Sequence, residues 1–302
     1  MTLKDYRVAI PSYKRPDTLK DRSLKILHDY KIDPSKIDIF VSDNDQKGIY
    51  ENTLPKGSYN KIIIGEEGIK NIRNFMPNYY PDGQYIFYMD DDIYGVYECN
   101  NSTDKIQKKF NKLKKLRSLK DLISKGFKLS ESSGITNWGV YPVYNPYFMK
   151  ATSNNLGDYV GTKLSYIIGF MTGVINNKKA ELRTIDDKED YERSIKYYLK
   201  DNGLLRFNNV TCDTKCYKEP GGMQVERTKK RIHDSAVYLT KQYPELCTLN
   251  TTKKSGFTEV RLRDRREDKP VLTLNNLGKV NRIEKKLTKK IKKKKSKRTK
   301  RN

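Results

Sequence analysis

The sequence is poor in the residues from which disulfide frameworks and structural zinc sites are built. It contains 4 cysteines and 2 histidines among 302 residues. The cysteines form no C-x-x-C pair, and two histidines are too few to complete a metal cage. This composition argues against a disulfide scaffold and a structural zinc site, and it favours a reducing compartment. The cysteines are Cys99, Cys212, Cys216 and Cys247.

Long apolar runs are also missing. Hydrophobic residues make up 35% of the chain and charged residues 33%, which excludes an integral membrane protein and a fibrous one. The most apolar window, residues 164–175, is too short and too polar to cross a bilayer. The first ten residues hold no apolar run of signal-peptide length. We therefore expect a soluble, intracellular protein of the cytoplasm.

Basic residues are in excess. Lys and Arg number 62 against 37 Asp and Glu, which gives a net charge of +25. Residues 279–302 hold fourteen basic residues and one acidic residue, a net +13, which leaves +12 on the other 278 residues. Because like charges repel and little can be buried, we expect the tail, 266–302, to be disordered. The charge favours a polyanion such as DNA, with an anionic membrane surface or a localisation signal as alternatives.

The first ninety residues alternate between strand and helix patterns. Such alternation predicts βαβ units and a mainly parallel sheet, in which ligands bind beyond the carboxyl ends of the strands. Polar clusters at 12–15, 42–45 and 90–92 fall at these ends. The expected strands are 6–10, 37–41, 61–64 and 84–89, and the expected helices are 17–30 and 69–76.

The second half has weaker patterns. Apolar residues at helical spacing predict a helix over 105–125 with a lysine-rich face, which is either a polyanion site or an ordinary solvated face. We expect one domain over 1–265, with a donor half at about 1–100 and an acceptor half at about 101–265. The other expected elements are a loop or irregular hairpin at 134–150, strands at 166–175 and 204–211, and helices at 187–200 and 227–243.

Three aspartates, Asp90, Asp91 and Asp92, follow the apolar run YIFYM. Carboxylates avoid such strand ends unless a positive charge meets them, because desolvated like charges repel. Mg²⁺ or Mn²⁺ prefers oxygen ligands and bridges carboxylates to phosphates. Because side chains alternate along an extended chain, Asp90 and Asp92 can serve one site while Asp91 points elsewhere. The pattern favours a metal site over a solvated acidic turn.

Four motifs occur in the order and spacing of the GT-A glycosyltransferases, especially their family-2-like branch. They are IPSYKRP at 10–16, VSD at 41–43, GIKNIRN at 68–74 and FYMDDDI at 87–93. Each is weak alone, but the four in register make roughly residues 6–220 resemble that family. The resemblance implies a GT-A (Rossmann-like) α/β fold, with a mixed, mainly parallel sheet flanked by helices, and a nucleotide-sugar donor.

The resemblance also implies roles for residues at the strand ends. The first motif would line the nucleotide pocket, although taken alone it fits an ordinary strand-to-helix turn better. The acidic run would hold the ribose and the metal-bound diphosphate, with Asp90 and Asp92 on Mn²⁺ or Mg²⁺. The residues implied in donor binding are Pro11, Ser12, Arg15, Asp43, Arg73, Asn74, Asp90 and Asp91.

A second acidic cluster, at 186–190, opens an expected helix and follows the glycine-bearing segment 169–173. It resembles the GT-A arrangement in which an acid at a helix start is the catalytic base, taking the acceptor's proton. Asp190 is the expected base, with Glu189 and Asp187 as second choices. From the residues alone, acids that complement the helix macrodipole explain the cluster equally well.

Two further features bear on the metal and the acceptor. The resemblance implies a late histidine on the metal, for which His233 is the candidate, although a surface or packed helix histidine is an equal alternative. Trp138, Tyr141 and Tyr144, with Tyr147, lie between the donor half and the proposed base. These rings could stack on a flat acceptor such as an extruded base or a sugar. Burial as loop anchors is the slightly favoured alternative.

Within the GT-A enzymes, the chain most resembles small glycosyltransferases of phages and large viruses that travel with TET/JBP-type oxygenases. That resemblance implies metal-dependent, inverting transfer of a sugar from a UDP-glucose-like donor to hydroxymethylated pyrimidine in DNA. A viral protein would act in the host cytoplasm or nucleus. The alternatives are a transferase acting on a glycan or protein hydroxyl, and a catalytically inactive GT-A-like protein that binds nucleic acid.

Overall fold

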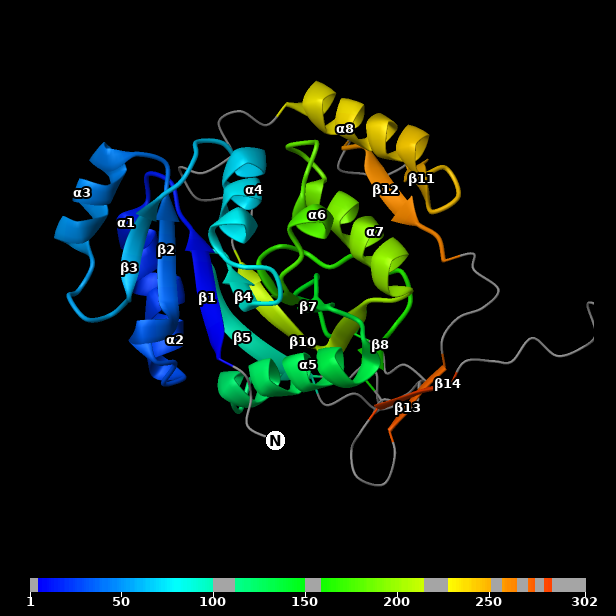
Figure 1. Ribbon diagram of the computed structural model, residues 1–302, viewed down its shortest axis with the longest axis horizontal. Helices are drawn as coiled ribbons and strands as arrows, with labels where there is room; N and C mark the ends of the chain where they lie inside the picture. Colours follow the sequence, from blue (N-terminus) through cyan, green and yellow to red (C-terminus); the bar gives the residue numbers. More distant parts are fainter. Residues whose placement is uncertain are drawn as a thin grey trace, which may run out of the picture.

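The computed structural model describes residues 5–99, 112–149, 159–214, 228–250, 257–264, 271–274 and 280–283. A mixed ten-stranded sheet runs through this part of the chain, with helices on both of its faces (Figure 1). Seven strands run in one direction, and only β5, β8 and β9 oppose them. The structure therefore confirms the predicted mixed, mainly parallel α/β sheet flanked by helices.

The amino-terminal half builds one side of the sheet from consecutive strand–helix units. Its strands are β1 (Tyr6–Pro11), β2 (Ile37–Val41), β3 (Lys61–Ile64) and β4 (Tyr85–Met89). Its helices are α1 (Pro16–Leu19), which continues through a π-helical turn (Lys20–Leu24) into α2 (Lys25–Asp29), then a 3-10 turn (Pro34–Lys36), α3 (Asn44–Thr53) and α4 (Ile69–Tyr79).

The carboxyl-terminal half completes the sheet in the order β4-β9-β7-β10-β5-β6. Its strands are β5 (Ile93–Cys99), β6 (Leu113–Lys115), β7 (Asn137–Tyr141), β8 (Val160–Gly161), β9 (Met171–Ile175) and β10 (Leu205–Thr214). Its helices are α5 (Leu119–Ser133), α6 (Lys178–Glu181) and α7 (Glu189–Asp201). Beyond the sheet lie α8 (Lys229–Gln242), β11 (Cys247–Asn250), β12 (Glu259–Leu262), β13 (Val271–Leu274) and β14 (Val280–Ile283).

Two hydrophobic clusters cover the two faces of the sheet. Along β4, Phe87 and Met89 join one cluster, while Ile86 and Tyr88 join the other. This alternation is the period-2 pattern of a strand buried on both sides, which is why YIFYM is apolar throughout. The strand emerges from this core directly into Asp90, so the polar residues after β4 lie at the edge of the packed interior.

The helix expected over 105–125 is wrong. Residues 105–111 lie outside the described chain, and Leu113–Lys115 pairs with β5 as strand β6. The helix α5 begins only at Leu119, where the Ser118 hydroxyl accepts a hydrogen bond from the Asp121 amide at 3.1 Å. This N-cap marks the start of the helix after the strand. The spacing of apolar residues, which continues across both elements, did not show that boundary.

Two other expectations need correction. The loop or irregular hairpin expected at 134–150 contains β7, a central strand between β9 and β10, because only the residues after Tyr141 are rich in proline. The expected strand at 166–175 is regular only from Met171. Within the tail expected to be disordered, β13 and β14 form an antiparallel pair, and the other residues of 266–302 lie outside the described chain. No described helix has the length and apolar character needed to cross a membrane.

Trp138 on β7 is a core residue, so its expected role in the acceptor site is wrong. Its side chain is 0% exposed and stacks on Phe87 at 5.8 Å between ring centroids. Gly126 and Gly173 leave the space that it fills, because a Cβ at either position would lie 2.3 or 2.2 Å from the indole. The two glycines and the tryptophan therefore pack together. They are far apart in the sequence, so a local sequence pattern does not show this contact.

Replacing Trp138 with Ala should lower the free energy of unfolding by about 3–5 kcal/mol, because it leaves a large cavity in a close-packed core. Urea denaturation followed by circular dichroism measures this change. Tyr144→Ala is the matched control, since Tyr144 is exposed, and it should change stability by about 0.5 kcal/mol or less. An unchanged unfolding midpoint for Trp138→Ala would contradict the assignment to the core.

Candidate active site

The middle aspartate of the acidic run, Asp91, is turned into the protein. Its carboxylate is 1% exposed and accepts a hydrogen bond from the Ser12 hydroxyl at 2.5 Å. Arg15 donates to it through Nε at 2.8 Å and forms an ion pair through Nη2 at 2.5 Å. Burial raises the pKa of Asp91, and Arg15 and Ser12 offset part of that rise. Asp91 therefore anchors the end of β4 rather than facing a ligand.

Ser12 and Arg15 consequently have a structural role, binding the buried Asp91, that the sequence did not reveal. The Ser12 hydroxyl also contacts the hydroxyl of Tyr50 on α3 at 2.7 Å, and the Arg15 amide donates to the same oxygen at 3.1 Å. This buried network ties the loop after β1 to α3 and to the end of β4. Ser12 and Arg15 were predicted to bind the donor, but in the structure their side chains bind Asp91.

The outer two aspartates are more accessible and less well neutralised. The Asp90 side chain is 28% exposed and contacts Nη2 of Arg73 on α4. Asp92 lies 3.6 Å from Nη1 of Arg15. Burial and the charges of Asp90 and Asp91 raise the pKa of Asp92 to about 7, although Arg15 acts in the opposite direction. This position carries more negative charge than its protein partners neutralise.

The residues present fit a hard divalent cation at Asp90 and Asp92. Oxygen ligands and uncompensated negative charge are what Mg²⁺ and Mn²⁺ require. The described chain brings no third His, Cys, Asp or Glu to these two, so phosphate oxygens and water would complete the coordination shell. The expected third ligand, His233, is exposed on α8, and its Nδ1 lies 3.0 Å from the Thr258 hydroxyl. The structure therefore does not place His233 in a three-residue metal group with Asp90 and Asp92.

A second group of acids lies at the start of α7, next to α4. Glu189 is buried and pairs with Arg183 at 3.0 Å between Nε and Oε2, with Nε of Arg73 at 3.8 Å from its other oxygen. Burial opposes ionisation of Glu189, but Arg183 and Arg73 outweigh it and lower the pKa to about 2. Glu189 is therefore a fixed anion with its own counter-ions, and it is poorly suited to accept a proton.

Asp190 is in the opposite electrostatic state. Burial and the neighbouring Glu189 charge raise the pKa of Asp190 to about 8, although Arg193 and Arg73 oppose the rise. Its Oδ2 accepts a hydrogen bond from the Tyr166 hydroxyl at 3.3 Å, and its Oδ1 has no hydrogen-bond partner in the described part of the chain. Asp190 thus combines a raised pKa with an oxygen that has no hydrogen-bond partner in the described chain, whereas Glu189 and Asp187 are each paired with an arginine.

Arg73 joins the two acidic groups into one site. Nη2 of Arg73 contacts Asp90. The same nitrogen and the Asp190 carboxylate both lie close to Gly169, whose missing side chain leaves room for them. A Cβ on Gly169 would lie 2.7 Å from Oδ1 of Asp190 and 3.3 Å from Nη2 of Arg73. The backbone at this point is fixed to the acidic run, because the Asp90 amide donates to the Phe170 carbonyl at 2.9 Å. Asp90, Arg73 and Asp190 thus meet at the carboxyl edge of the sheet.

Other predicted site residues have local structural roles. Asp187 is 1% exposed and pairs with Arg231 of α8 at 2.6 Å, so it is not the base. Asn74 accepts from the Arg183 amide at 2.7 Å and donates to its carbonyl at 3.0 Å. Asp43 caps α3, accepting from the Gln46 amide at 2.8 Å.

The residues expected at the rim of the site are spread over several elements. Pro11 is half-buried at the end of β1, beside Phe40 of β2. Tyr141 is half-buried under the guanidinium of Arg206, 5.2 Å from the ring centroid. Tyr144 is exposed and contacts the ring of Tyr97 at 5.1 Å.

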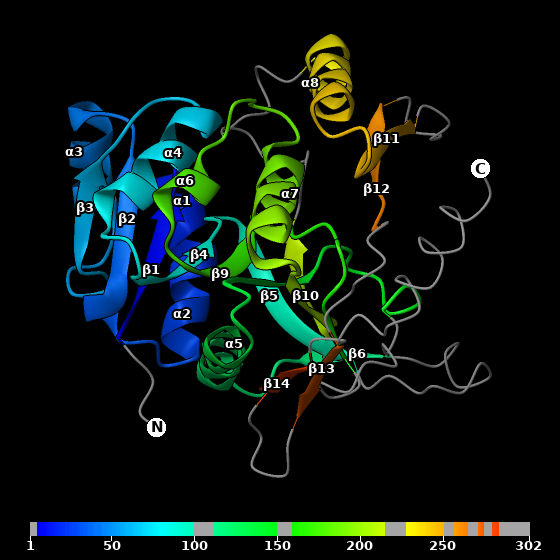
Figure 2. The same ribbon diagram turned by 45° about the vertical axis from the view of Figure 1, so that its right-hand side comes forward.

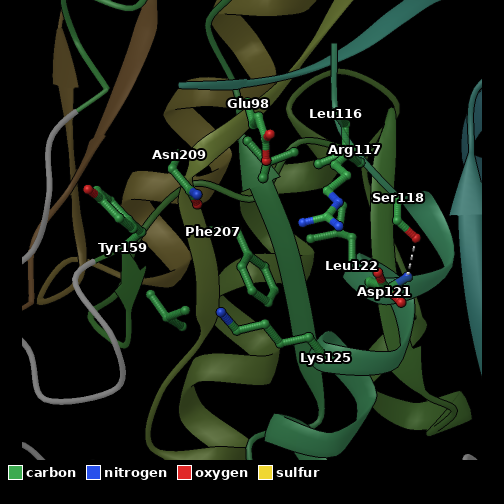
Figure 3. Close-up of a pocket in the computed structure, with 12 residues that line it drawn as sticks. Glu98, Leu116, Arg117, Ser118, Asp121, Leu122, Lys125, Tyr159, Phe207 and Asn209 are labelled. Atoms are coloured by element: carbon green, nitrogen blue, oxygen red, sulfur yellow. Dashed lines mark hydrogen bonds between the residues drawn. The ribbon is translucent and has the colours of Figure 1, made fainter. Parts of the chain in front are cut away.

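A pocket of about 270 Å³ lies elsewhere, between α5, β5 and β10 (Figure 3). Glu98 and Lys125 are among the residues around it, and Phe207 forms part of its apolar wall. Glu98 is six residues along β5 from Asp92, about 20 Å at the rise of a strand. This pocket is therefore separate from the acidic site.

Comparison with known proteins gives limited support. No family model matches the chain, and no curated protein does. Among solved structures, S. aureus TarS 1–349 aligns with a TM-score of 0.41 and 12% identity, covering 80% of this chain and 72% of that one. Its complex with UDP gives 0.40 and 11% over the same shares. Similarity at this level assigns no activity.

The raised pKa of Asp190 predicts a dependence of stability on pH. The folded protein keeps the Asp190 proton up to about pH 8, whereas an unfolded chain loses it near pH 4. The folded state therefore binds more protons between pH 4 and 8, and this carboxyl makes the free energy of unfolding fall as pH rises through that window.

Asp190→Asn removes this titration. The free energy of unfolding of the wild type should therefore fall relative to that of Asp190→Asn as pH rises from 4 to 8. Urea denaturation at a series of pH values measures the difference. Asp45→Asn, at an exposed position on α3, is the control. Curves for wild type and Asp190→Asn that stay parallel over this range would show that Asp190 is not held protonated.

Proposed function

We propose that this protein is an inverting glycosyltransferase that moves a sugar from a nucleotide-sugar donor, UDP-glucose-like, to a hydroxyl acceptor with the help of Mn²⁺ or Mg²⁺. The observation that carries the proposal is the meeting of Asp90, Arg73 and Asp190 at the carboxyl edge of the sheet. One part of that site is suited to a diphosphate and its cation, and the other part is suited to taking a proton. The four motifs in GT-A order support the same reaction.

Each residue has a defined task in this reaction. Asp90 and Asp92 would hold the cation, which neutralises charge on the departing diphosphate. The Arg73 guanidinium, fixed between the acids, offers a second positive group to the same phosphates. Asp190 accepts the proton from the acceptor hydroxyl as that oxygen attacks the sugar carbon. A base with a pKa near the working pH is effective, because it is partly ionised and still basic enough.

The nucleotide end of the donor is assigned to the ends of β1 and β2. Pro11 and Asp43 lie at these two strand ends, where the nucleotide of a donor would reach beyond the acidic run. Asp43 is exposed and its carboxylate already accepts local hydrogen bonds. We therefore assign the diphosphate end of the donor to Asp90, Asp92 and Arg73, and the nucleotide end to the rim formed by Pro11 and Asp43.

The two acids should fail in different ways when replaced. Asp92→Asn should lower Mn²⁺-dependent donor turnover by about a hundredfold or more, because the cation loses a ligand. Asp190→Asn should leave UDP and Mn²⁺ binding unchanged, as measured by isothermal titration calorimetry, and stop transfer. Asp45→Asn again serves as the control. Unchanged turnover in Asp92→Asn would refute the metal role, and full transfer by Asp190→Asn would refute the base.

The proposed acceptor is hydroxymethylated pyrimidine in DNA, and the basic surface supports it. Seven basic side chains between residues 112 and 128 are exposed, with Asp121 as the single acid among them. None of the seven forms an ion pair within the described chain, so they are available to phosphates. We call these residues the basic strip: Lys112, Lys114, Lys115, Arg117, Lys120, Lys125 and Lys128.

The basic strip lies at the end of the sheet opposite the acidic site. Figure 1 shows α5 across the base of the molecule, below the central strands, with α7 and α8 above. Only a long polymer can reach both surfaces, which favours DNA over a small acceptor. The exposed rings of Tyr144, Tyr147 and Phe148 lie on the segment that follows β7. They are better placed than the buried Trp138 to stack on an extruded base.

Reversing two charges of the basic strip should weaken DNA binding. Lys120→Glu/Lys128→Glu should lower the slope of log affinity against log salt by about 0.9 for each phosphate that the protein no longer neutralises. Lys56→Glu/Lys61→Glu changes the same charge at exposed positions on the far side of the molecule and is the matched control. Fluorescence anisotropy of labelled duplexes measures both variants. Equal slopes would remove the strip from the DNA interface.

The remaining alternatives differ in what they would turn over. Mass spectrometry of duplex DNA containing 5-hydroxymethyl pyrimidine, incubated with the protein and a panel of nucleotide sugars, tests the proposed acceptor directly. Mn²⁺-dependent hydrolysis of the donor without DNA modification would favour a glycan or protein hydroxyl as acceptor. DNA binding without any donor turnover would favour an inactive nucleic-acid-binding protein.

A further inference from the structure

The turn before Asp190 is held by a part of the chain whose other described side chains do not belong to the site. We call α8, β11 and β12 the C-terminal unit. Its apolar residues Ala236, Leu239 and Val260 belong to the same core cluster as Ile195 and Tyr198 of α7. The views in Figures 1 and 2 agree in placing this unit beside α7, away from β1 to β3. Its polar contacts reach the residues immediately before α7.

Two ion pairs connect the C-terminal unit to that turn. Arg231 of α8 binds Asp187 at 2.6 Å, and Glu259 of β12 binds Lys188 at 2.7 Å. The Asp187 carboxylate is 1% exposed, and Lys188 is 13% exposed at its side chain. The partners Arg231 and Glu259 are 31% and 22% exposed, so each pair joins a more buried group of the turn to a partly exposed one of the C-terminal unit. Removing Arg231 would leave the buried Asp187 charge without this counter-ion.

The backbone of the turn needs this support. Lys188 has a φ of 63°, a left-handed conformation that is strained for a residue other than glycine. Such conformations persist where surrounding contacts over-determine them. Lys188 is the residue that precedes Glu189 and Asp190, so its conformation sets the direction in which the first turn of α7 begins.

Aromatic contacts extend the same support to Asp190. The ring of Tyr191 stacks on that of Tyr166, at 4.2 Å between centroids with 16° between planes. Tyr166 donates its hydroxyl hydrogen to Asp190, and the Tyr191 hydroxyl lies 3.4 Å from the Glu259 carboxylate. Glu259 thus contacts the residues on both sides of the acidic pair, and the Tyr166–Tyr191 stack continues to the Asp190 carboxyl.

We infer that Arg231 and Glu259 are positioning residues, through which the C-terminal unit holds Asp190 toward the acceptor. The inference rests on the proposed function, in which Asp190 is the base. Other charged and titratable groups facing Asp190 are Glu189 and Arg193 from α7, Arg73 from α4 and Tyr166 from the segment before β9. None of these comes from the C-terminal unit, so the unit acts on Asp190 through the turn.

Replacing Arg231 with Met should lower kcat about tenfold or more while leaving the donor KM unchanged, since a small displacement of a catalytic group is costly. Glu259→Gln should act in the same direction. Arg231→Lys should recover part of the rate. Lys230→Met is the matched control, because Lys230 neighbours Arg231 and, among the described residues, forms its ion pair with Asp234 at the exposed surface of α8.

Because Arg231→Met leaves the buried Asp187 charge without this partner, the variant could unfold. The double variant Arg231→Met/Asp187→Asn removes both charges and keeps the test available. It should show the same fall in kcat, and the rise of activity with pH should move to lower pH as Asp190 becomes more hydrated. A folded double variant with wild-type kcat and pH profile would overturn the inference.

A measurement without turnover separates this inference from the proposed function. Carbon-13 NMR of the Asp190 carboxyl, identified by its loss in Asp190→Asn, should show a lower pKa in the double variant than in wild type. Amide hydrogen exchange of residues 187–191 should become faster in the double variant but not in Lys230→Met. If both properties are unchanged, Arg231 does not position Asp190. If both change in a protein that turns over no donor, the positioning role stands and the proposed function fails.

Discussion

The site depends on the guanidinium of Arg73, which lies between two groups of acids that would otherwise repel one another. It is 5% exposed, and its neighbours are Asp90 on one side and Glu189 with Asp190 on the other. Burial alone would lower the pKa of Arg73, but these carboxylates outweigh it and raise the pKa, so the side chain stays charged. Burial, together with the charge of neighbouring carboxylates, raises the pKa values of Asp92 and Asp190. The fold thus leaves negative charge where a cation and a proton can bind.

Neighbouring acids in the sequence have opposite tasks because each one meets a different partner. Asp91 is neutralised inside the protein by Arg15, which frees Asp90 and Asp92 from fixing the backbone. Glu189 is neutralised by Arg183, and its retained negative charge is one reason that Asp190 holds its proton. In both runs a buried, paired carboxylate stands next to one that is only partly paired. This arrangement gives a rigid support and a reactive group within two or three residues, without a separate element for each.

Elements with a strong local signal could be predicted from the sequence. The expected strands at 37–41 and 61–64 coincide with β2 and β3, because short apolar runs there are bounded by polar residues and turns. The strand β7 was missed because its identity depends on Gly126 and Gly173, which are distant in sequence and make room for Trp138. The acidic residues of the site could likewise be found as clusters. Their partners Arg183, Tyr166 and Arg231 could not, since ordinary spacing gives no sign of which distant charge or hydroxyl will meet them.

A proposed base with a raised pKa places two opposing demands on the residues around it. Burial raises the pKa of Asp190, which makes its carboxylate a stronger base, but the ionised carboxylate then repels its anionic neighbours. The edge of the sheet can supply rigid acids at Asp90 and Asp92, but it cannot also fix a helix that starts in a left-handed turn at Lys188. The C-terminal unit supplies that constraint from outside the sheet, through partners placed on the residues just before the base. The two halves of the site are thus held by different parts of the chain, and Arg73 is where they meet.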